Sequence, residues 1–287
     1  MDTQKLHTEH TPYCIGFAES RIGGRAENQD AYGFGDTERG FLVTVCDGMG
    51  GGPAGKVAST LAAEEILAGF YEAEGDDSTV DVIEKAIKRA NMAIIQEGEK
   101  NPAFKGMGST TTVLLLSEKS AHVAYVGDSR VYQLRKKKKI YRTFDHSMVF
   151  EMVKQRVVTE EQARLSEQSN VITRALGISQ ELQVDITELP YKKGDRFVLC
   201  TDGIHGMLPE KELLKLFSKK TTDLEALTNE IALYIDNIGQ EAGGGHDNLT
   251  IAIIETNINS KIKPRNKLYE SILNWKRAWL RHRDRRQ

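Results

Sequence analysis

The sequence has few of the features that mark secreted, redox or membrane proteins. Its 287 residues include only three cysteines, Cys14, Cys46 and Cys200, which are far apart and form no CxxC pair. This spacing predicts reduced, buried thiols and argues against disulfides or a zinc site. The N-terminus lacks the apolar stretch of a signal peptide, and no segment approaches the ~20 apolar residues of a membrane-spanning helix. We therefore expect a cytoplasmic protein.

The composition is that of an ordinary globular protein, with 39% hydrophobic and 28% charged residues. A chain of this length can bury a core without disulfides. The net charge of −2 is unevenly distributed, because residues 261–287 carry ten Lys and Arg against two acids, a net +8 that leaves −10 elsewhere. An acidic body suits the binding of dications, and a basic tail suits an anionic partner. We expect no nucleic-acid partner.

Short apolar runs rich in β-branched residues predict strands at residues 41–46, 109–116, 121–128, 183–189, 196–201 and 249–255. The chain around Lys136–Lys139 leaves no room for a crossover helix, so we expect antiparallel hairpins with a turn at these lysines. Apolar spacings of three and four predict helices after Pro53, behind a cap at Ser78, and over Asp223–Ile238. This mixture predicts a layered α+β domain with sheets inside and helices outside.

The composition changes after Glu255, where polar residues and Pro264 predict a linker. We expect one globular domain over residues 1–258, followed by a linker and a basic amphipathic helix over residues 259–287. The apolar stripe of that helix is Leu268, Ile272, Trp275 and Trp279. Three interpretations stay open: the helix packs on the domain, binds an anionic membrane surface, or docks on an acidic partner.

Three predicted strands each deliver an aspartate at their end, namely Asp47, Asp128 and Asp202. A single Asp-Gly pair is simply a common turn signal. The repetition matters, because several buried carboxylates at one edge repel one another unless a cation compensates them. Asp30 joins the set because it lies just before a short apolar run, and Asp247 because it lies just before the last predicted strand.

The donor types indicate which cation would bind. Carboxylate and carbonyl oxygens suit Mg²⁺ or Mn²⁺, whereas zinc normally recruits His or Cys. Two such ions ~3.5–4 Å apart activate a bridging water in many phosphate-ester hydrolases. Phosphoryl transfer is therefore the expected reaction class.

Six short motifs then occur in an order that resembles the PPM, or PP2C-like, protein phosphatases of bacterial type. They are R-x-x-NQD at Arg25–Asp30, DGMGG at Asp47–Gly51, GSTTT at Gly108–Thr112, GDSR at Gly127–Arg130, TDG at Thr201–Gly203 and GGHDN at Gly244–Asn248. The resemblance spans about residues 13–256. It implies a four-layer α-β-β-α sandwich with two mainly antiparallel sheets, and an enzyme that hydrolyses phosphoserine and phosphothreonine in proteins.

The resemblance also implies a two-metal centre of Mn²⁺ or Mg²⁺. Its ligands would be Asp30, Asp47, the Gly48 carbonyl, Asp202 and Asp247. Asp128 would join Asp202 at a third, weaker metal site. Arg25 matches the phosphate-binding arginine of the family, since its planar guanidinium can hold two phosphate oxygens. Without the motif, a surface salt bridge is the simpler interpretation of Arg25.

Two departures from the family pattern bear on the mechanism. Met49 stands where eukaryotic members have the histidine thought to protonate the leaving group. The general acid is then a metal-bound water, His205 or His146, although both histidines also fit ordinary structural roles. Gln29 replaces the glutamate of some relatives, which would alter one water-mediated metal contact.

The resemblance implies phosphoserine and phosphothreonine proteins as partners, including a cognate serine/threonine kinase and its substrates. We expect a monomer in the cytoplasm, peripheral at the inner face of the membrane if residues 261–287 bind an anionic surface.

Three competing interpretations remain. Residues Gly50–Val57 nearly match a P-loop, but Val57 stands where the motif needs a hydroxyl, and antiparallel hairpins do not suit the parallel sheet of such enzymes. None of the three cysteines begins the Cys-x5-Arg pattern of a cysteine phosphatase. A non-catalytic binding domain would keep the fold without turnover.

Overall fold

The computed structural model describes residues 4–5, 13–73 and 77–261, and two antiparallel sheets form its centre. One sheet, here called sheet A, has the order β1 (Gln4–Lys5), β2 (Cys14–Arg21), β12 (Leu249–Thr256), β11 (Asp195–Cys200), β8 (Arg130–Arg135), β9 (Lys138–Arg142). The other, sheet B, has the order β10 (Asp185–Leu189), β7 (Ala121–Val126), β6 (Thr111–Leu116), β4 (Gly40–Met49), β3 (Asp30–Thr37), and β5 (Gly108–Ser109) extends β4.

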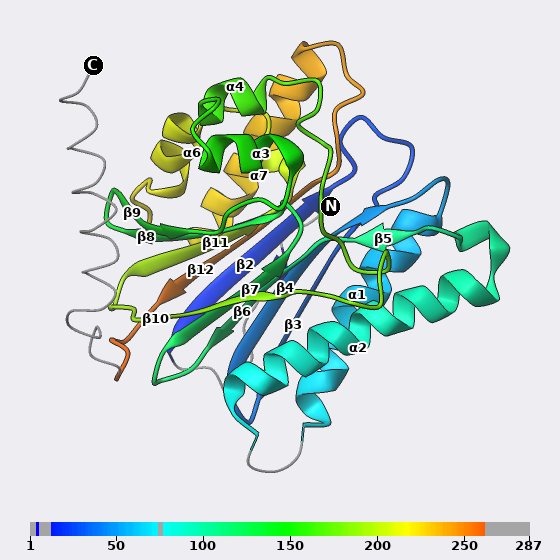
Figure 1. Ribbon diagram of the computed structural model, residues 1–287. Helices are drawn as coiled ribbons and strands as arrows, with labels where there is room; N and C mark the ends of the chain where they lie inside the picture. The colour runs from blue at the N-terminus through cyan, green and yellow to red at the C-terminus, as the bar shows by residue number, and fades with distance from the viewer. Residues whose placement is uncertain (1–3, 6–12, 74–76, 262–287) are drawn as a thin grey trace.

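Helices cover the outer face of each sheet (Figure 1). The outer face of sheet B carries α1 (Ala54–Tyr71) and α2 (Thr79–Lys100), with η1 (Pro102–Phe104) after them, and that of sheet A carries α5 (Asp202–His205), α6 (Glu210–Phe217) and α7 (Leu224–Glu241). The short helices α3 (Met148–Lys154) and α4 (Glu160–Arg164) lie in the connection from β9 to β10. The predicted α-β-β-α sandwich is confirmed.

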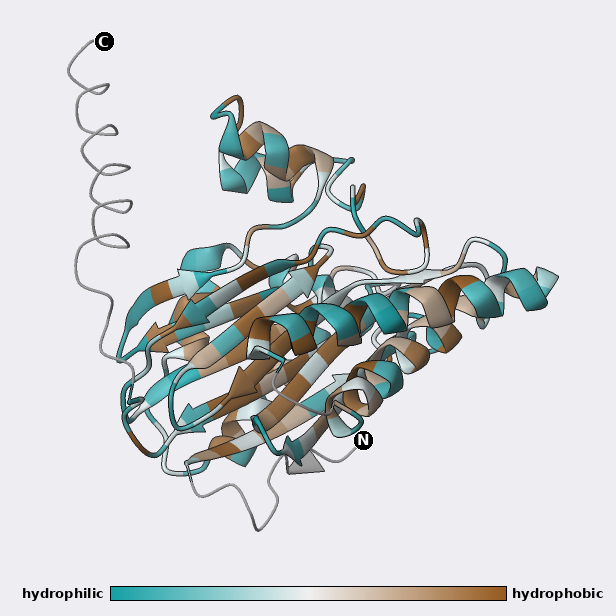
Figure 2. Ribbon diagram, turned by 60° about the horizontal axis from the view of Figure 1, so that its bottom comes forward, coloured by the Kyte–Doolittle hydropathy of each residue, from teal (hydrophilic) through white to brown (hydrophobic). Residues whose placement is uncertain are grey.

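Alternate residues of each strand pack into different layers. Along β4, Phe41 and Val43 face the other sheet, whereas Leu42 and Cys46 pack under the helices. Because central strands such as β6, β7 and β11 are buried along their whole length, their sequences show continuous apolar runs in place of alternation. Figure 2 shows the hydrophobic strands inside, beneath helices whose outer faces are hydrophilic.

Local signals in the sequence explain where elements begin. Ser78 caps α2 by accepting a hydrogen bond from the Asp81 N–H at 3.2 Å, as predicted. The lysine turn is shorter than expected, because Lys138 already belongs to β9 and only Lys136 and Lys137 connect the strands. The three cysteines are buried and unpaired, which agrees with the prediction.

The end of the described chain is bonded to the domain. The Ser260 N–H donates to the Tyr191 carbonyl at 3.0 Å, and the Lys261 N–H donates to the Glu118 carbonyl at 2.9 Å. A boundary at residue 258 stays a prediction, and most of the predicted tail, residues 262–287, lies outside the described residues. None of the helices in the described ranges is long and apolar enough to cross a membrane.

Candidate active site

Strand order and register bring the predicted aspartates to one end of the sandwich. Asp30 and Asp47 are direct register partners across β3 and β4 of sheet B. Asp202 directly follows Thr201 at the end of β11, and Asp247 lies just before β12, the neighbour of β11 in sheet A. Asp128 lies between β7 and β8, where the chain crosses from sheet B to sheet A. Both sheets therefore contribute carboxylates to the same edge.

Four of these five carboxylates line a cavity of about 490 Å³. Its lining includes Arg25, Asp47, Gly48, Asp128, Asp202 and Asp247. Asp30 does not line the cavity, and its Oδ2 accepts a hydrogen bond from the Thr201 hydroxyl at 2.9 Å. The structure thus places five of the six predicted metal-binding residues on one cavity wall and the sixth beside it.

Burial and the repulsion between their charges disfavour the ionised form of these aspartates. Burial raises the pKa of Asp30 to about 7 and that of Asp202 to about 6, and the negative charge of Asp247 adds to both shifts. Burial and the charge of Asp202 likewise raise the pKa of Asp47 and of Asp128 well above the ordinary value. A nearby cation would remove this repulsion.

The donor set fits a divalent cation bound by oxygens. Oδ1 of Asp202 is buried and has no hydrogen-bond partner within the described residues, so it is available as a ligand. Carboxylates with one backbone carbonyl are the ligands that Mg²⁺ and Mn²⁺ prefer. No three His, Cys, Asp or Glu side chains in the described ranges already form a metal-binding group. The structure therefore supplies the donors without a preformed coordination geometry.

Gly48 occupies a position that only glycine fits. A Cβ added there would lie 1.9 Å from the Gly55 carbonyl oxygen at the start of α1. The Gly48 N–H donates to the Gln29 carbonyl at 3.1 Å, and the Gln29 side-chain amide donates to the Gly52 carbonyl at 2.6 Å. Gln29 thus fixes the loop that presents Gly48.

Arg25 lies at the rim of the cavity, where 52% of its side chain is exposed. Its Nη2 is 2.9 Å from Oδ2 of Asp247, so it forms the surface salt bridge while also facing the predicted site. The loop that carries Arg25 is held by Asn248. The Asn248 Oδ1 accepts from the Gln29 N–H at 2.8 Å, and its Nδ2 donates to the carbonyls of Ile22 and Glu27.

Asn248 and the hydroxyl residues of the motifs had no predicted role, although they hold the site in place. Thr110 Oγ1 accepts from the Asp47 N–H at 3.0 Å and is 2.7 Å from the Ser129 hydroxyl. The Thr201 hydroxyl holds Asp30 and also accepts from the Thr250 N–H at 3.0 Å. In the sequence, the signal that could have identified these residues was their position inside the motifs GSTTT, TDG and GGHDN.

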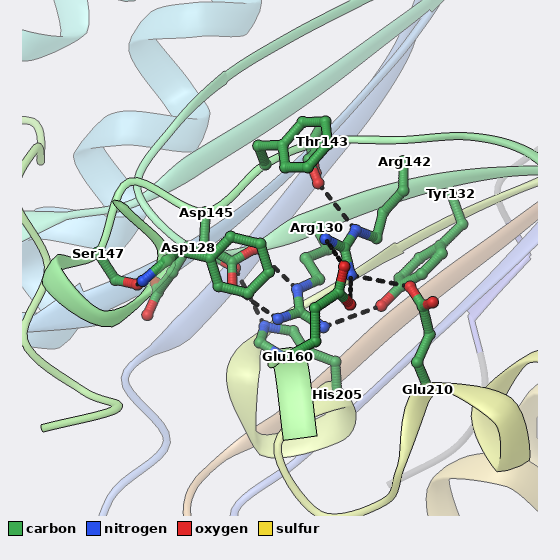
Figure 3. Close-up of polar contacts among 12 residues, drawn as sticks. Asp128, Arg130, Tyr132, Arg142, Thr143, Asp145, Ser147, Glu160, His205 and Glu210 are labelled. Atoms are coloured by element: carbon green, nitrogen blue, oxygen red, sulfur yellow. Dashed lines mark hydrogen bonds and ion pairs between the residues drawn. The ribbon is translucent and has the colours of Figure 1, made fainter. Parts of the chain in front are cut away.

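A buried ion pair lies directly behind Asp128 (Figure 3). Arg130 donates from Nε to Asp145 Oδ1 at 2.8 Å and from Nη2 to Oδ2 at 2.6 Å, while its Nη1 donates to the Tyr132 hydroxyl at 3.2 Å. Burial alone would raise the pKa of Asp145, but the Arg130 charge and hydrogen bonds outweigh burial and lower it. The pair fixes the β8 end of the loop that carries Asp128.

Arg142 connects the α3–α4 segment to α6. Its side chain is only 4% exposed, and Nη1 lies 2.7 Å from Glu160 of α4 and 2.8 Å from Glu210 of α6. The guanidinium also covers the Phe150 ring, 5.0 Å from its centroid. Figure 3 shows both glutamates reaching Arg142. The connection from β9 to β10, which contains α3 and α4, also brings Asn170 to the 490 Å³ cavity.

Both candidate general-acid histidines are held in structural contacts. Burial lowers the pKa of His146, whose ring stacks on Tyr125 at 4.8 Å and whose Nδ1 accepts from the Gly127 N–H. Burial and the Arg130 charge lower the pKa of His205 to about 3, and its Nε2 is 3.0 Å from the Asp128 carbonyl oxygen. Neither ring lines the 490 Å³ cavity, whereas Met49 does. A neutral, hydrogen-bonded ring is a poor proton donor.

Comparison with known proteins decides the family. The family model described as protein phosphatase 2C matches residues 19–233. The chain belongs to the protein phosphatase 2C family. A serine/threonine phosphatase stp of Listeria monocytogenes is 31% identical over 242 residues, which cover 83% of this chain and 93% of that protein.

Solved structures agree with this assignment to the protein phosphatase 2C family. The serine/threonine phosphatase Stp1 of Staphylococcus aureus superposes with a TM-score of 0.77 at 27% identity, covering 87% of this chain and 97% of that one. The catalytic domain of the phosphatase PstP, solved with two manganese ions, gives a TM-score of 0.70 at 27% identity, covering 85% and 99%. The predicted phosphatase family is confirmed, and the P-loop interpretation is excluded.

Proposed function

We propose that this protein phosphatase 2C member hydrolyses phosphoserine and phosphothreonine in proteins with the help of divalent metal ions. The observation that carries the proposal is the 490 Å³ cavity lined by carboxylates from both sheets, where Oδ1 of Asp202 has no hydrogen-bond partner among the described residues. The names of its relatives support the substrate class. The two manganese ions of PstP support the metal.

In the proposed site, Asp30, Asp47, the Gly48 carbonyl, Asp202 and Asp247 would hold two Mn²⁺ or Mg²⁺ ions, and Asp128 with Asp202 would hold a third. When bound, the ions would activate water for direct attack on phosphorus and neutralise charge on the phosphate. Arg25 binds two phosphate oxygens from the cavity rim. Thr201 and Thr110 keep Asp30 and the Asp47 backbone in place.

The proton that the leaving serine or threonine oxygen needs comes from solvent in this proposal. Met49 has no titratable group, and burial lowers the pKa of both nearby histidines, whose rings are hydrogen-bonded to backbone. Gly48, Gly50 and Gly52 line the cavity together with Asp47 and Asp202, and none of them carries a side chain that could donate a proton. The described part of the chain then contributes binding and orientation, and none of its side chains acts as the general acid in this proposal.

The test is hydrolysis of a small aryl phosphate with and without Mn²⁺, followed by phosphoserine, phosphothreonine and phosphotyrosine peptides. Asp202→Ala and Asp247→Ala should abolish Mn²⁺-dependent turnover and weaken Mn²⁺ binding in calorimetry, because each removes a ligand. Asp77→Asn, on an exposed aspartate next to α2, is the matched control. Absence of turnover by the wild-type chain in saturating Mn²⁺ would favour a non-catalytic binding domain instead.

We further propose that the substrates include a cognate serine/threonine kinase and its targets, and that the enzyme is a monomer. Phosphoproteomics of a deletion strain would identify the targets, and light scattering would give the mass in solution. Residues 261–287 carry a net charge of +8, which supports a peripheral anionic membrane site for the tail. Equal liposome co-sedimentation with and without these residues would remove the membrane role.

A further inference from the structure

A second hollow lies at the other end of sheet A from the aspartates. It encloses about 1030 Å³ between the β8–β9 turn, the start of β11 and the connection from α6 to α7. In the β8–β11 pair, Arg135 lies opposite Asp195 at this end and Arg130 opposite Cys200 at the aspartate end. Five strand steps span roughly 17 Å. Figure 1 shows the β8–β9 turn at the left of the sandwich, far from the loop after β2.

The charged side chains of this hollow are almost all basic. They are Lys136, Lys137, Arg196, Lys219 and Lys220, with Glu255 as the only acid in the lining. The lining therefore carries a net charge of +4, although residues 1–260 of the chain carry −10. We name it the basic groove. Such a local reversal of sign attracts anions to one place on an acidic protein.

Arg196 holds the groove together and neutralises its negative groups. It is only 8% exposed, and its Nη2 lies 2.7 Å from Glu255. Its Nη1 donates to the carbonyls of Phe217 and Lys219, at 2.7 and 3.1 Å, where α6 ends. The partial negative charge of a helix C-terminus is thus compensated inside the protein. Because Arg196 compensates these negative groups, the lysines of the lining can bind a ligand.

Three of the four lysines have no ion-pair partner within the described part of the chain. Lys219 pairs with Glu230, but no ion pair involves Lys136, Lys137 or Lys220 among the described residues. Lys136 and Lys137 come from the wall at the β8–β9 turn, and Lys220 comes from the wall after α6. Charges spread over two walls suit an extended anionic chain better than a single small ion.

The surroundings indicate which anionic chain would bind. Leu134 and Phe217 lie fully buried in the floor, so the lining offers no exposed large apolar side chain that could enter a bilayer. The basic tail of the protein has the wrong sign to occupy the groove itself. We propose that the basic groove binds an acidic segment of the phosphoprotein substrate. This rests on the proposed function, and it places the segment at least about five residues from the phosphorylated one, since an extended residue spans ~3.3 Å.

Fluorescence anisotropy with a labelled, unphosphorylated, glutamate-rich peptide tests the groove without catalysis. The variant K137E/K220E changes two exposed lysines and lowers the charge of the lining from +4 to zero. This variant should bind the peptide about ten-fold more weakly than wild type. Added salt should weaken peptide binding by the wild type to a similar extent. The matched control K100E/K105E reverses two exposed lysines that are absent from the lining and should bind like wild type.

A kinetic arm separates the groove from the active site. For wild type, a phosphothreonine peptide with an acidic extension should have a lower KM than one with a neutral extension, and K137E/K220E should lose that difference. Aryl phosphate turnover should be unchanged in the variant. Equal peptide affinity of K137E/K220E and wild type would overturn the proposal, as would binding of phosphatidylglycerol vesicles but not of the peptide. A wild type inactive on aryl phosphate would instead refute the proposed function, whatever the anisotropy shows.

Discussion

Substitution of Gly48 by alanine tests whether the backbone at the end of β4 sets the geometry of the site. The new Cβ would lie 1.9 Å from the Gly55 carbonyl oxygen, whereas real contacts of this kind essentially never fall below 3.0 Å. The start of α1 or the Asp47–Gly48 backbone must therefore move by at least 1.1 Å, the difference between these distances. Backbone lies on both sides, because the Gln29 carbonyl oxygen would be 2.7 Å away. No side chain can absorb the strain.

The expected loss of stability is about 3 kcal/mol, at the upper end for an overpacked site. A displacement of about 1 Å at a catalytic group typically lowers turnover by about 10²-fold. Urea unfolding and Mn²⁺-dependent aryl phosphate hydrolysis measure the two effects. Gly51→Ala is the matched control, since a Cβ there meets nothing within 4 Å. If Gly48→Ala kept wild-type stability and turnover, the tight contact between β4 and α1 would not control the site.

Three further predictions concern side chains around the cavity. Arg25→Lys should raise the KM for phosphorylated peptides by about 10-fold and Arg25→Ala by about 100-fold, with a smaller change in kcat. The reason is that the bidentate contact with the phosphate is lost. An unchanged KM would mean that Arg25 only forms its salt bridge and does not bind the phosphate. Arg142→Met should lower the free energy of unfolding by about 2 kcal/mol, less than a fully buried pair would cost because 42% of the Glu160 side chain is exposed. A double-mutant cycle with Glu160→Gln should show coupling, and strict additivity would contradict the contact. Asp145→Asn should cost about 3–5 kcal/mol at pH 7, since Arg130 loses its buried partner. The pKa of Asp145 is lowered by folding, so its contribution is present above the unfolded pKa of about 3.9 and is lost as pH falls through the folded pKa. The difference between the two proteins in urea unfolding should therefore shrink at pH 3, and a constant difference would contradict the ion pair.

The sequence predicted the layers and the acid cluster, because both depend on patterns that repeat along the chain. Continuous apolar runs indicated strands buried on two faces, and aspartates at their ends indicated a shared edge. It could not show that Asp30 lies beside the cavity under Thr201, since that contact joins residues 171 positions apart. Nor could it separate the two interpretations of Arg25, which the structure places in a salt bridge and on the cavity rim together.

The histidines show a different limit. His205 was a candidate as general acid because it lies three residues after Asp202, and His146 because it lies in the FDHS segment that was expected to form a flap, but position in sequence says nothing about burial. His146 is 1% exposed and stacked on Tyr125, and His205 is bonded to the Asp128 backbone. Only the folded environment, which lowers both pKa values, shows that these rings serve the structure around the site.

The position of the aspartates between two sheets explains how the fold can keep an unfavourable cluster of charge. Asp30 and Asp47 are fixed by sheet B, whereas Asp202 and Asp247 are fixed by neighbouring strands of sheet A. The apolar residues between the sheets, such as Val45 and Leu199, are fully buried and hold the two pairs together. To separate the carboxylates, the sheets would have to part and expose that core, at a cost of roughly 25 cal/mol for each Å² of apolar surface. Repulsion within the site is therefore opposed by the whole inter-sheet core, and a divalent cation is the less costly way to relieve it.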